Sequence, residues 1–365
     1  MRPSILFLDD DPVVRVVRLL LSDAEDDPWI LDYFAPEEID LSRLTRAARG
    51  LRRSDGVEIA RAATGARGVP SAGASIIIFR RGSVTAELLD ANPGLRLVQR
   101  LGERPTDIDL AAAAARNVWV SCLPRRSLAY TAEHTLMLML ALAKWLLPSD
   151  RAVREGRFDA ARVKPTGNVA YNWAAVPDVG GLSGKAIGIV GLGEVGTLVA
   201  RLGSAFGMRV IYHKRRRMPL DQERALGAEY AELPDLLAQA DFVVLLASDV
   251  PENECLANRE FFATMRSTAF FVNTSRGRLV DEDALYGALV SGLIAGAALD
   301  VHRIEPRPAG DRFASLTNVV LTPHVAGGSR GALLDELETI LENCRAALSG
   351  QPPRHLVTAG RSAPQ

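Results

Sequence analysis

The amino-acid sequence predicts an α/β protein of two domains, in which helices cover parallel sheets. Three observations support this. The chain has 365 residues, which is more than one compact domain usually contains. Short apolar runs such as "ASIIIF" and "NVWVSC" alternate with helix-like stretches in the first part of the chain. The same rhythm returns after residues 148–184, a loop-like segment rich in Pro, Gly, Asn and Asp.

Composition and charge limit the partners that the chain can have. Hydrophobic residues make up 48% and charged residues 24%, which is typical of a soluble globular protein. The net charge is only -1, so we expect no nucleic-acid partner. Cys122, Cys255 and Cys344 are odd in number and widely spaced, which favours reduced thiols and gives no metal-binding pattern.

No segment predicts export or membrane insertion. The N-terminus "MRPSILFLDDDP" runs into acids after a short apolar stretch and does not resemble a secretory signal. The most apolar helix-like segment, "TLMLMLALA" at residues 135–143, is too short to span a bilayer. We therefore expect a cytoplasmic protein without membrane contact.

The stretch "KAIGIVGLGEVGTLVARLGSAFG" reads as a strand, a glycine-rich turn and a helix. Gly191 permits the tight turn, Gly193 lets the backbone approach a pyrophosphate, and Gly196 lets helix and strand pack closely. The N–H groups at Glu194 and Val195 then face the phosphates at the positive end of the helix dipole. The pattern predicts a Rossmann-type, doubly wound dinucleotide-binding domain.

The next predicted strand ends in "IYHKRRR". About 20 residues after the glycine turn, NAD enzymes place an acid that binds the ribose 2′-hydroxyl, whereas a nearby Arg suits the 2′-phosphate of NADP. Here Lys214, Arg215 and Arg216 stand at and beside this position. They predict NADP as the cofactor, with NAD as the alternative. Arg216 and Arg217 are equally compatible with a solvated basic turn.

Three further patches carry a resemblance: "FVNTSRGRLVDEDAL", "GAALDVHRIEP" and "NVVLTPHVAGGS". Together with "GLGEVG" they closely resemble the D-isomer-specific 2-hydroxyacid dehydrogenases. The resemblance is strong over residues 184–328 and looser over residues 75–145. It implies a Rossmann cofactor domain at residues 122–324 and a flavodoxin-like substrate domain made from both chain ends, residues 1–121 and 325–365.

The resemblance assigns Arg276, Glu305 and His324 as the catalytic residues. A guanidinium can hold the carboxylate of a 2-oxo acid and polarise its ketone. An imidazolium can supply the proton that the new alkoxide needs. A carboxylate beside the imidazole would favour its charged form. Arg276 and His324 are therefore also expected to bind the substrate.

Further residues follow from the same resemblance. Asp300 matches the position that contacts the nicotinamide carboxamide, and Thr274 and Ser275 are expected near the nicotinamide ring. Ser248 is expected to contact the cofactor, although "LLASDVPEN" departs from the His, Pro and Thr usual in the family.

The substrate loop departs from the family pattern. The family commonly has Gly-x-Gly-x-Asp-Asn-Ile-Asp, whereas this chain has "GERPTDID": Gly102 remains and Arg104 replaces the second glycine. Arg81, in "FRRGSV", lies near another loop that faces the substrate carboxylate. We expect Arg81, Gly102 and Arg104 to bind the substrate, with Arg104 suited to a larger or second acidic group.

The sequence therefore predicts an NAD(P)H-dependent reductase of small 2-oxo acids such as glyoxylate or hydroxypyruvate. Two alternatives remain: a cofactor-sensing protein like the corepressors of the family, and an enzyme that oxidises a related small anion with NAD. The apolar helix after "TAEH" indicates a homodimer interface, although a buried core helix predicts the same pattern.

Overall fold

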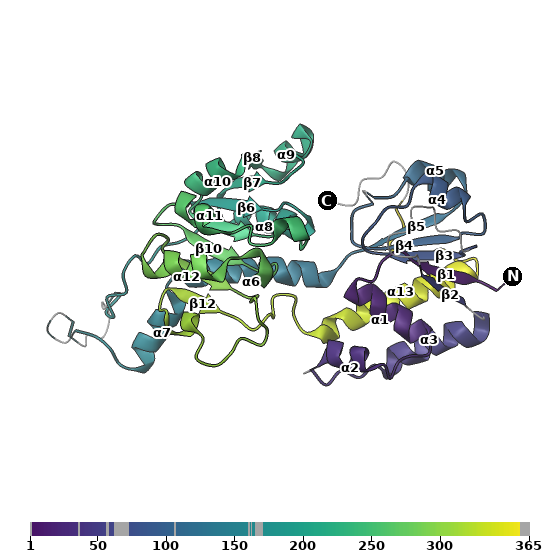
Figure 1. Cartoon of the computed structure of the whole chain (residues 1–365), viewed down its shortest axis with the longest axis horizontal. Coiled ribbons are helices and arrows are strands. Elements are labelled where there is room, and N and C mark those ends of the chain that lie inside the picture. Colours follow the sequence, from purple (N-terminus) through teal and green to yellow (C-terminus); the bar gives the residue numbers. More distant parts are fainter. Residues whose placement is uncertain are drawn as a thin grey trace. The chain divides into compact units, whose positions relative to one another are not determined.

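The computed structural model describes residues 2–35, 37–55, 58–61, 73–105, 107–159, 161, 163–164 and 171–357. The chain forms two compact units, shown in Figure 1. Unit 1 consists of Met1–Arg126 and Ser329–Gln365, and unit 2 of Ser127–Gly328. These junctions lie a few residues beyond the expected domain boundaries at 121/122 and 324/325.

Unit 1 is built on a five-stranded parallel sheet in the order β2-β1-β3-β4-β5. This is the flavodoxin-like order. The strands are β1 (Ser4–Phe7), β2 (Glu58–Arg61), β3 (Ile76–Phe79), β4 (Leu97–Leu101) and β5 (Trp119–Leu123).

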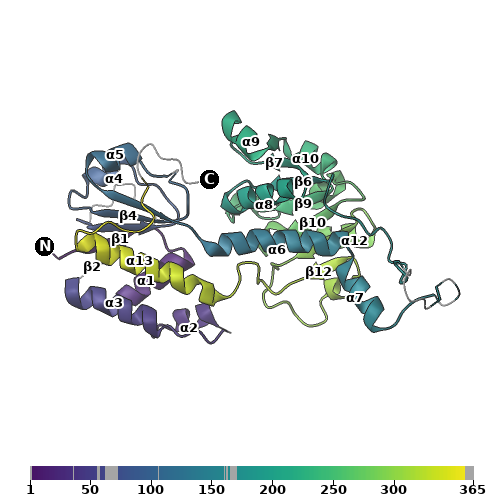
Figure 2. The ribbon, with the colours of Figure 1, turned by 180° about the vertical axis from the view of Figure 1, so that it is seen from behind.

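Helices cover both faces of the unit 1 sheet. One face carries α1 (Pro12–Leu21), α3 (Ser42–Asp55) and α13 (Leu333–Leu348), and the other α4 (Ala86–Asp90) and α5 (Leu110–Ala115), as Figures 1 and 2 show. The short helix α2 (Pro28–Phe34) packs with the first group. Helix α13 follows unit 2 in the sequence. It belongs to this group because its apolar side chains share a core with those of α1 and α3.

Unit 2 is built on a seven-stranded parallel sheet in the order β12-β11-β10-β9-β6-β7-β8. Its strands are β6 (Ala186–Val190), β7 (Arg209–His213), β8 (Ala228–Tyr230), β9 (Phe242–Leu245), β10 (Phe270–Asn273), β11 (Gly296–Leu299) and β12 (Val319–Leu321). Strands β6 to β8 run in order from the centre of the sheet to one side. The chain then crosses to β9, next to β6, and β9 to β12 run in order to the other side. This confirms the predicted doubly wound fold.

The central strands of unit 2 are apolar along their whole length because helices cover both faces. One face packs against α6 (Arg126–Ala143), α8 (Glu194–Ala205) and α9 (Leu220–Leu226). The other packs against α10 (Leu233–Gln239), α11 (Arg259–Thr264) and α12 (Glu282–Val290). Helix α7 (Leu146–Arg154) follows α6. Of the helices in the described part of the chain, none has the length and apolar character needed to cross a membrane.

Four short 3-10 helices complete the elements of the described chain. They are η1 (Pro251–Asn253), η2 (Gly277–Leu279), η3 (Arg312–Ser315) and η4 (Arg330–Ala332). The first three lie in unit 2, where η2 directly follows Arg276.

Candidate active site

The predicted cofactor and catalytic residues of unit 2 all follow the C-terminal ends of its parallel strands. The glycine turn follows β6, the basic turn β7, Ser248 β9, Thr274 to Arg276 β10, Asp300 and Glu305 β11, and His324 β12. The winding direction reverses between β6 and β9. In open α/β sheets, ligands bind at this edge beside that switch point.

The three glycines of the turn have the separate roles that the sequence predicts. Gly191 has φ +103°, and a Cβ there would lie 2.5 Å from the backbone N of Ala247, so only glycine fits. A Cβ on Gly196 would lie 2.6 Å from the Gly191 carbonyl oxygen. A Cβ on Gly193 would have no described atom within 4 Å, so this side of the turn is open. Beyond it, Glu194 and Val195 begin α8 and are half-buried.

Two of the four cations in the basic turn after β7 have side-chain hydrogen bonds within unit 2. Lys214 Nζ donates a hydrogen bond to the Leu192 carbonyl oxygen in the glycine turn, at 3.3 Å. Arg217 forms an ion pair with Glu223. Arg215 and Arg216 are exposed. Ser248, on the loop after β9, is also exposed.

The turn after β10 is held by a buried amide. Asn273 Oδ1 accepts hydrogen bonds from the N–H and hydroxyl of Ser275, and Asn273 Nδ2 donates one to the Arg276 carbonyl oxygen at 3.0 Å. Thr274 is buried, with its hydroxyl 2.8 Å from that of Thr135 on α6. The Arg276 side chain is exposed. The guanidinium donates a hydrogen bond to the Ser275 carbonyl oxygen at 2.6 Å, so the predicted arginine lies exposed over its own turn.

Gly277 brings this turn against the loop after β11. A Cβ on Gly277 would lie 2.0 Å from the backbone carbon of His302. No side chain fits there, so the segment that carries Arg276 and the segment that leads to Glu305 are in direct backbone contact.

The side chains of Glu305 and His324 are in hydrogen-bond contact. His324 Nδ1 lies 2.8 Å from Glu305 Oε2, and the other carboxylate oxygen accepts a hydrogen bond from the His302 N–H at 2.8 Å. Because the carboxylate accepts at Nδ1, Nδ1 carries a hydrogen and Nε2 remains for chemistry. The two side chains are 42% and 35% exposed, so a ligand can reach them.

Asp300 holds the loop that carries His324. Its side chain is fully buried and accepts hydrogen bonds from the Thr322 hydroxyl and from the N–H groups of Val325 and Ala326, at 2.6 to 2.9 Å. His134 Nε2 lies 3.4 Å away. Burial alone would raise the pKa of Asp300, but these donors outweigh it and hold the pKa well below its usual value.

The Asp300 contacts also fix an uncommon backbone conformation. His324 has φ +56°, which is rare for a residue with a side chain, and its N–H donates to the Asp300 carbonyl oxygen at 2.8 Å. In the described structure the carboxylate of Asp300 is thus engaged by its own unit. The contact between Asp300 and the nicotinamide carboxamide stays a prediction.

Four supporting residues were not assigned roles from the sequence: His134, His302, Arg307 and Thr322. His302 Nδ1 accepts from Arg307 Nε at 3.0 Å, so Nε2 carries the hydrogen and donates to the Thr322 carbonyl oxygen at 2.9 Å. Arg307 also pairs with Glu282 and Asp311. His134, His302 and Thr322 stand inside the motifs "TAEH", "GAALDVHRIEP" and "NVVLTPHVAGGS", but these motifs did not indicate their partners.

The remaining predicted residues belong to unit 1. Gly102, with φ +144°, follows β4 and donates its N–H to the Leu123 carbonyl oxygen, and Arg104 is half-buried two residues later. Arg81 is exposed after β3, and its N–H donates to Asp9. These three residues thus share the C-terminal edge of the unit 1 sheet.

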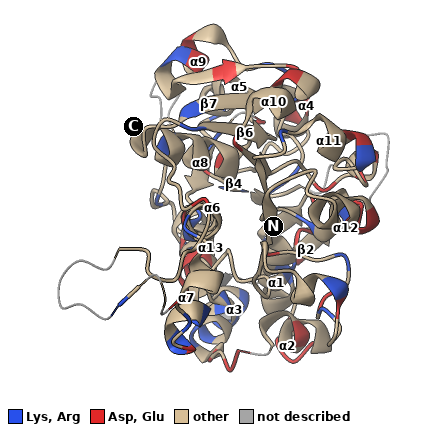
Figure 3. Ribbon diagram, turned by 90° about the vertical axis from the view of Figure 1, so that its left-hand side faces the viewer, with Lys and Arg blue, Asp and Glu red and all other residues tan. Residues whose placement is uncertain are grey.

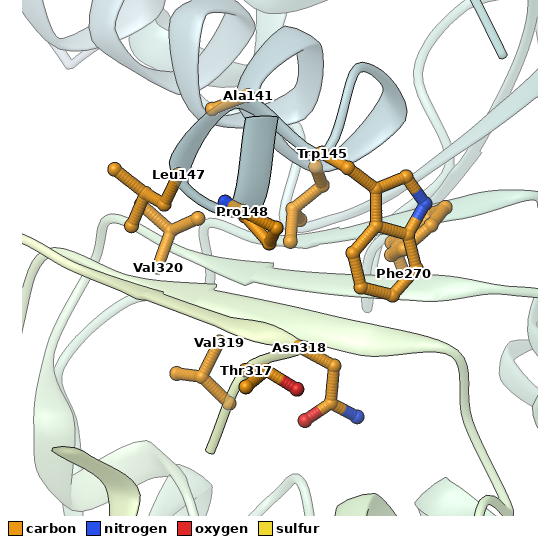
Figure 4. A pocket seen from close by; sticks show the side chains of 10 residues that line it. Ala141, Trp145, Leu147, Pro148, Phe270, Thr317, Asn318, Val319 and Val320 are labelled. Atoms are coloured by element: carbon orange, nitrogen blue, oxygen red, sulfur yellow. The ribbon is translucent and has the colours of Figure 1, made fainter. Parts of the chain in front are cut away.

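The small hollow in Figure 4 lies at the opposite edge of the unit 2 sheet. It is lined by Trp145 and Pro148 on one side and by Thr317 and Asn318, which precede β12, on the other. Its volume is about 10 Å³, which holds about one water molecule. Trp145 Nε1 is buried without a hydrogen-bond partner among the described residues. This hollow is too small for a substrate.

A doubly wound sheet with an open glycine turn and a histidine–carboxylate pair on one edge defines a dinucleotide-dependent dehydrogenase. Residues 136–326 match the model of the D-isomer specific 2-hydroxyacid dehydrogenase NAD-binding domain. The chain belongs to this family, and the resemblance is confirmed. It is an NAD(P)-dependent oxidoreductase, and unit 2 binds a nicotinamide cofactor.

Similar proteins agree with this assignment. The chain is 38% identical to a glyoxylate reductase of Korarchaeum cryptofilum over 274 residues, which are 75% of this chain and 79% of that protein. It is 39% identical to a glyoxylate reductase of Thermococcus kodakarensis over 276 residues, 75% of this chain and 80% of that protein.

A solved structure covers nearly the whole chain. It is an NADPH-dependent glyoxylate/hydroxypyruvate reductase of Sinorhizobium meliloti in complex with citrate. It is 25% identical, covers 98% of this chain and 97% of its own, and has a TM-score of 0.55.

Proposed function

We propose that this protein is an NADPH-dependent reductase of small 2-oxo acids, with glyoxylate or hydroxypyruvate as substrates. The observation that carries the proposal is the 2.8 Å pair between His324 Nδ1 and Glu305, on the strand edge that also carries the glycine turn and Arg276. The names of the similar proteins support the substrate class.

The chain's own residues supply binding and a proton. Arg276, exposed on its fixed turn, binds the substrate carboxylate and polarises the adjacent ketone. When bound, the reduced cofactor would supply a hydride to the ketone carbon. His324 donates the Nε2 proton to the ketone oxygen as that oxygen gains negative charge, which gives the 2-hydroxy acid. Glu305 orients the imidazole through its contact with Nδ1.

The cofactor preference follows from the turn after β7. It carries Lys214, Arg215 and Arg216 and no acid, so its positive charge attracts a 2′-phosphate, which the acid of NAD enzymes would repel. The open side at Gly193 and the first turn of α8, at Glu194 and Val195, fit a pyrophosphate.

The remaining cofactor and substrate contacts complete the proposal. Ser248, Thr274, Ser275 and Asp300 lie on the strand edge expected to face the nicotinamide half. Arg81, Gly102 and Arg104 lie on the corresponding edge of unit 1 and are proposed to bind the substrate carboxylate.

The test is turnover by the purified protein. Glyoxylate, hydroxypyruvate and larger 2-oxo acids are assayed with NADPH and with NADH in parallel. His324→Gln should lower kcat by about 10²- to 10⁴-fold, because the general acid is lost. His355→Gln is a matched control, since His355 is exposed in unit 1 and also has φ +56°. A change within twofold for His324→Gln would refute the assignment, and a lack of any turnover would favour a cofactor sensor.

We also propose that the protein is a homodimer in the cytoplasm. An apolar groove of about 400 Å³ lies between α6, α7 and α8, and Met137, Leu146 and Phe206 on it are each at least 44% exposed. A second copy would cover these side chains. Sedimentation equilibrium should give twice the chain mass, and Met137→Asp should shift it towards the monomer. A wild-type monomer at all concentrations would contradict this.

The cytoplasmic location is supported by the three cysteines, which are free, as in a reducing compartment.

A further inference from the structure

The basic turn after β7 is closed by a tyrosine and a glutamate. Tyr212 Oη donates a hydrogen bond to Glu223 Oε1 at 2.6 Å and accepts one from the Met218 N–H at 3.1 Å. Arg217 donates to both oxygens of Glu223, at 2.7 and 2.8 Å. Residues 212–218 are therefore fixed at both ends by a single cluster.

Two members of this cluster are buried, whereas the Arg217 side chain is 52% exposed. Tyr212 is fully buried and Glu223 is 6% exposed. The hydrogen bonds from Arg217 and Tyr212 lower the pKa of Glu223 to about 2, and burial together with Glu223 raises the pKa of Tyr212 to about 12. The Arg217 guanidinium also lies 5.3 Å from the ring centroid of Tyr230 on β8. The ion pair between Arg217 and Glu223 is thus charged throughout the working pH range of an enzyme.

The cluster leaves two of the four cations available. Lys214 is directed back to the glycine turn, and Arg217 is neutralised by Glu223. Arg215 and Arg216 are exposed, and neither has a hydrogen bond or an ion pair with a described residue. Figure 3, in which Lys and Arg are blue and Asp and Glu red, shows both colours at α9, the helix that carries Glu223.

We propose that Glu223 is a positioning residue for cofactor choice: through Arg217 and Tyr212 it holds the basic turn in the shape that presents Arg215 and Arg216 to a 2′-phosphate. This inference rests on the proposed NADPH preference. A mobile turn would have to become ordered when the phosphate binds, and that cost weakens binding. NADH has a hydroxyl at this position and makes no such demand.

The experiment compares dissociation constants of NADPH and NADH, measured by fluorescence titration of the purified protein. In Glu223→Gln the ion pair is lost while the side-chain volume is kept. NADPH should bind about 3- to 10-fold more weakly, the cost of ordering one or two side chains, and NADH should change less than twofold. The matched control is Glu232→Gln, since Glu232 accepts a hydrogen bond from Tyr230 at 2.9 Å but does not hold the turn.

Two further variants separate the possible failures. Tyr212→Phe keeps the buried ring and removes the hydroxyl, so it should repeat the effect of Glu223→Gln if that variant folds poorly. Arg215→Ala/Arg216→Ala should weaken NADPH more than either. If only the double variant loses NADPH affinity, the role of Glu223 is refuted and the cofactor proposal stands. If the double variant keeps full affinity, the cofactor proposal itself fails. Equal losses for both cofactors in Glu223→Gln would also refute the role of Glu223.

Discussion

The strand ends of the two units use the same device for different purposes. In unit 1, Asp9 follows β1, and its Oδ2 accepts hydrogen bonds from the N–H groups of Arg80 and Arg81 in the loop after β3, at 2.7 and 3.0 Å. In unit 2, Asp300 follows β11 and accepts from Val325 and Ala326 in the loop after β12. Each carboxylate ties the loop of a neighbouring strand.

Asp9 and Asp300 differ in how deeply they are buried and in the residues on the loops that they hold. Asp9 is half-buried, and its loop carries cations. Asp300 is fully buried, has two further side-chain neighbours in His134 and Thr322, and its loop carries His324 in an uncommon backbone conformation. An acid at the edge that carries the proposed catalytic residues can therefore serve to hold a loop. A tighter hold is used where orientation matters most.

Asp300→Asn should break the stronger of the two devices. The two loop N–H groups donate to different carboxylate oxygens, and an asparagine side chain has only one oxygen that can accept. One buried donor therefore loses its partner, at a cost of about 1–3 kcal/mol in the free energy of unfolding. The loop of His324 would relax, and kcat should fall by roughly 10- to 100-fold, as misplacement of a reacting group does. Urea unfolding and steady-state kinetics measure the two effects. Full activity in a destabilised protein would show that the loop needs no such hold.

The same variant gives a pH test. The pKa of Asp300 is depressed in the folded protein, so its ionised form stabilises the fold above the unfolded value of about 4, and this stabilisation is lost as the pH falls towards the lower folded value. The difference in unfolding free energy between wild type and Asp300→Asn should be constant above about pH 5 and shrink below about pH 4. A difference independent of pH down to acid unfolding would contradict the charged state of Asp300.

Asp9→Asn should have a smaller effect of another kind. The loop of Arg80 and Arg81 would loosen, at a cost of about 0.5–1.5 kcal/mol in unfolding free energy. KM for the 2-oxo acid should rise about threefold with kcat within twofold, because binding and not proton transfer is affected. If kcat fell as far as in Asp300→Asn, the proposal that Asp300 supports proton transfer and Asp9 supports substrate binding would be wrong.

Arg104→Ala should have the smallest effect, and that effect should be confined to the choice of substrate. The loss of this cation should lower the rate for dicarboxylic relative to monocarboxylic 2-oxo acids by roughly two- to threefold, as expected for a partly solvated charge contact. Arg116→Ala is the control, since Arg116 pairs with Asp90 at the end of α5. Unchanged relative rates would remove Arg104 from the substrate site.

Patterns local in sequence predicted much of this molecule. The fold class and the family followed from "GLGEVG", from alternating apolar runs and from three short motifs, because periodicity and turn chemistry act over a few residues. The structure brings Glu305 and His324 together, 19 residues apart in sequence. Their roles stay predictions until tested.

Contacts distant in sequence were out of reach. The neighbours of Asp300 include His134, and the carboxylate of Asp9 binds N–H groups 71 and 72 residues away. Nothing in the local pattern around Asp9 indicates such partners, because side-chain pairing between loops depends on sheet order. Arg217 and Glu223, six residues apart, could have been paired from sequence once α9 was placed.

The path of the chain through the two units bears on how the protein is made. Unit 2 is one uninterrupted segment, whereas unit 1 gains α13 only after residue 328. Since domains generally fold as they leave the ribosome, the half whose synthesis starts first is the last to be finished. Until then, the apolar faces of α1 and α3 lack the cover that Leu337, Ile340 and Leu341 provide, so a nascent or truncated chain would be a client for chaperones.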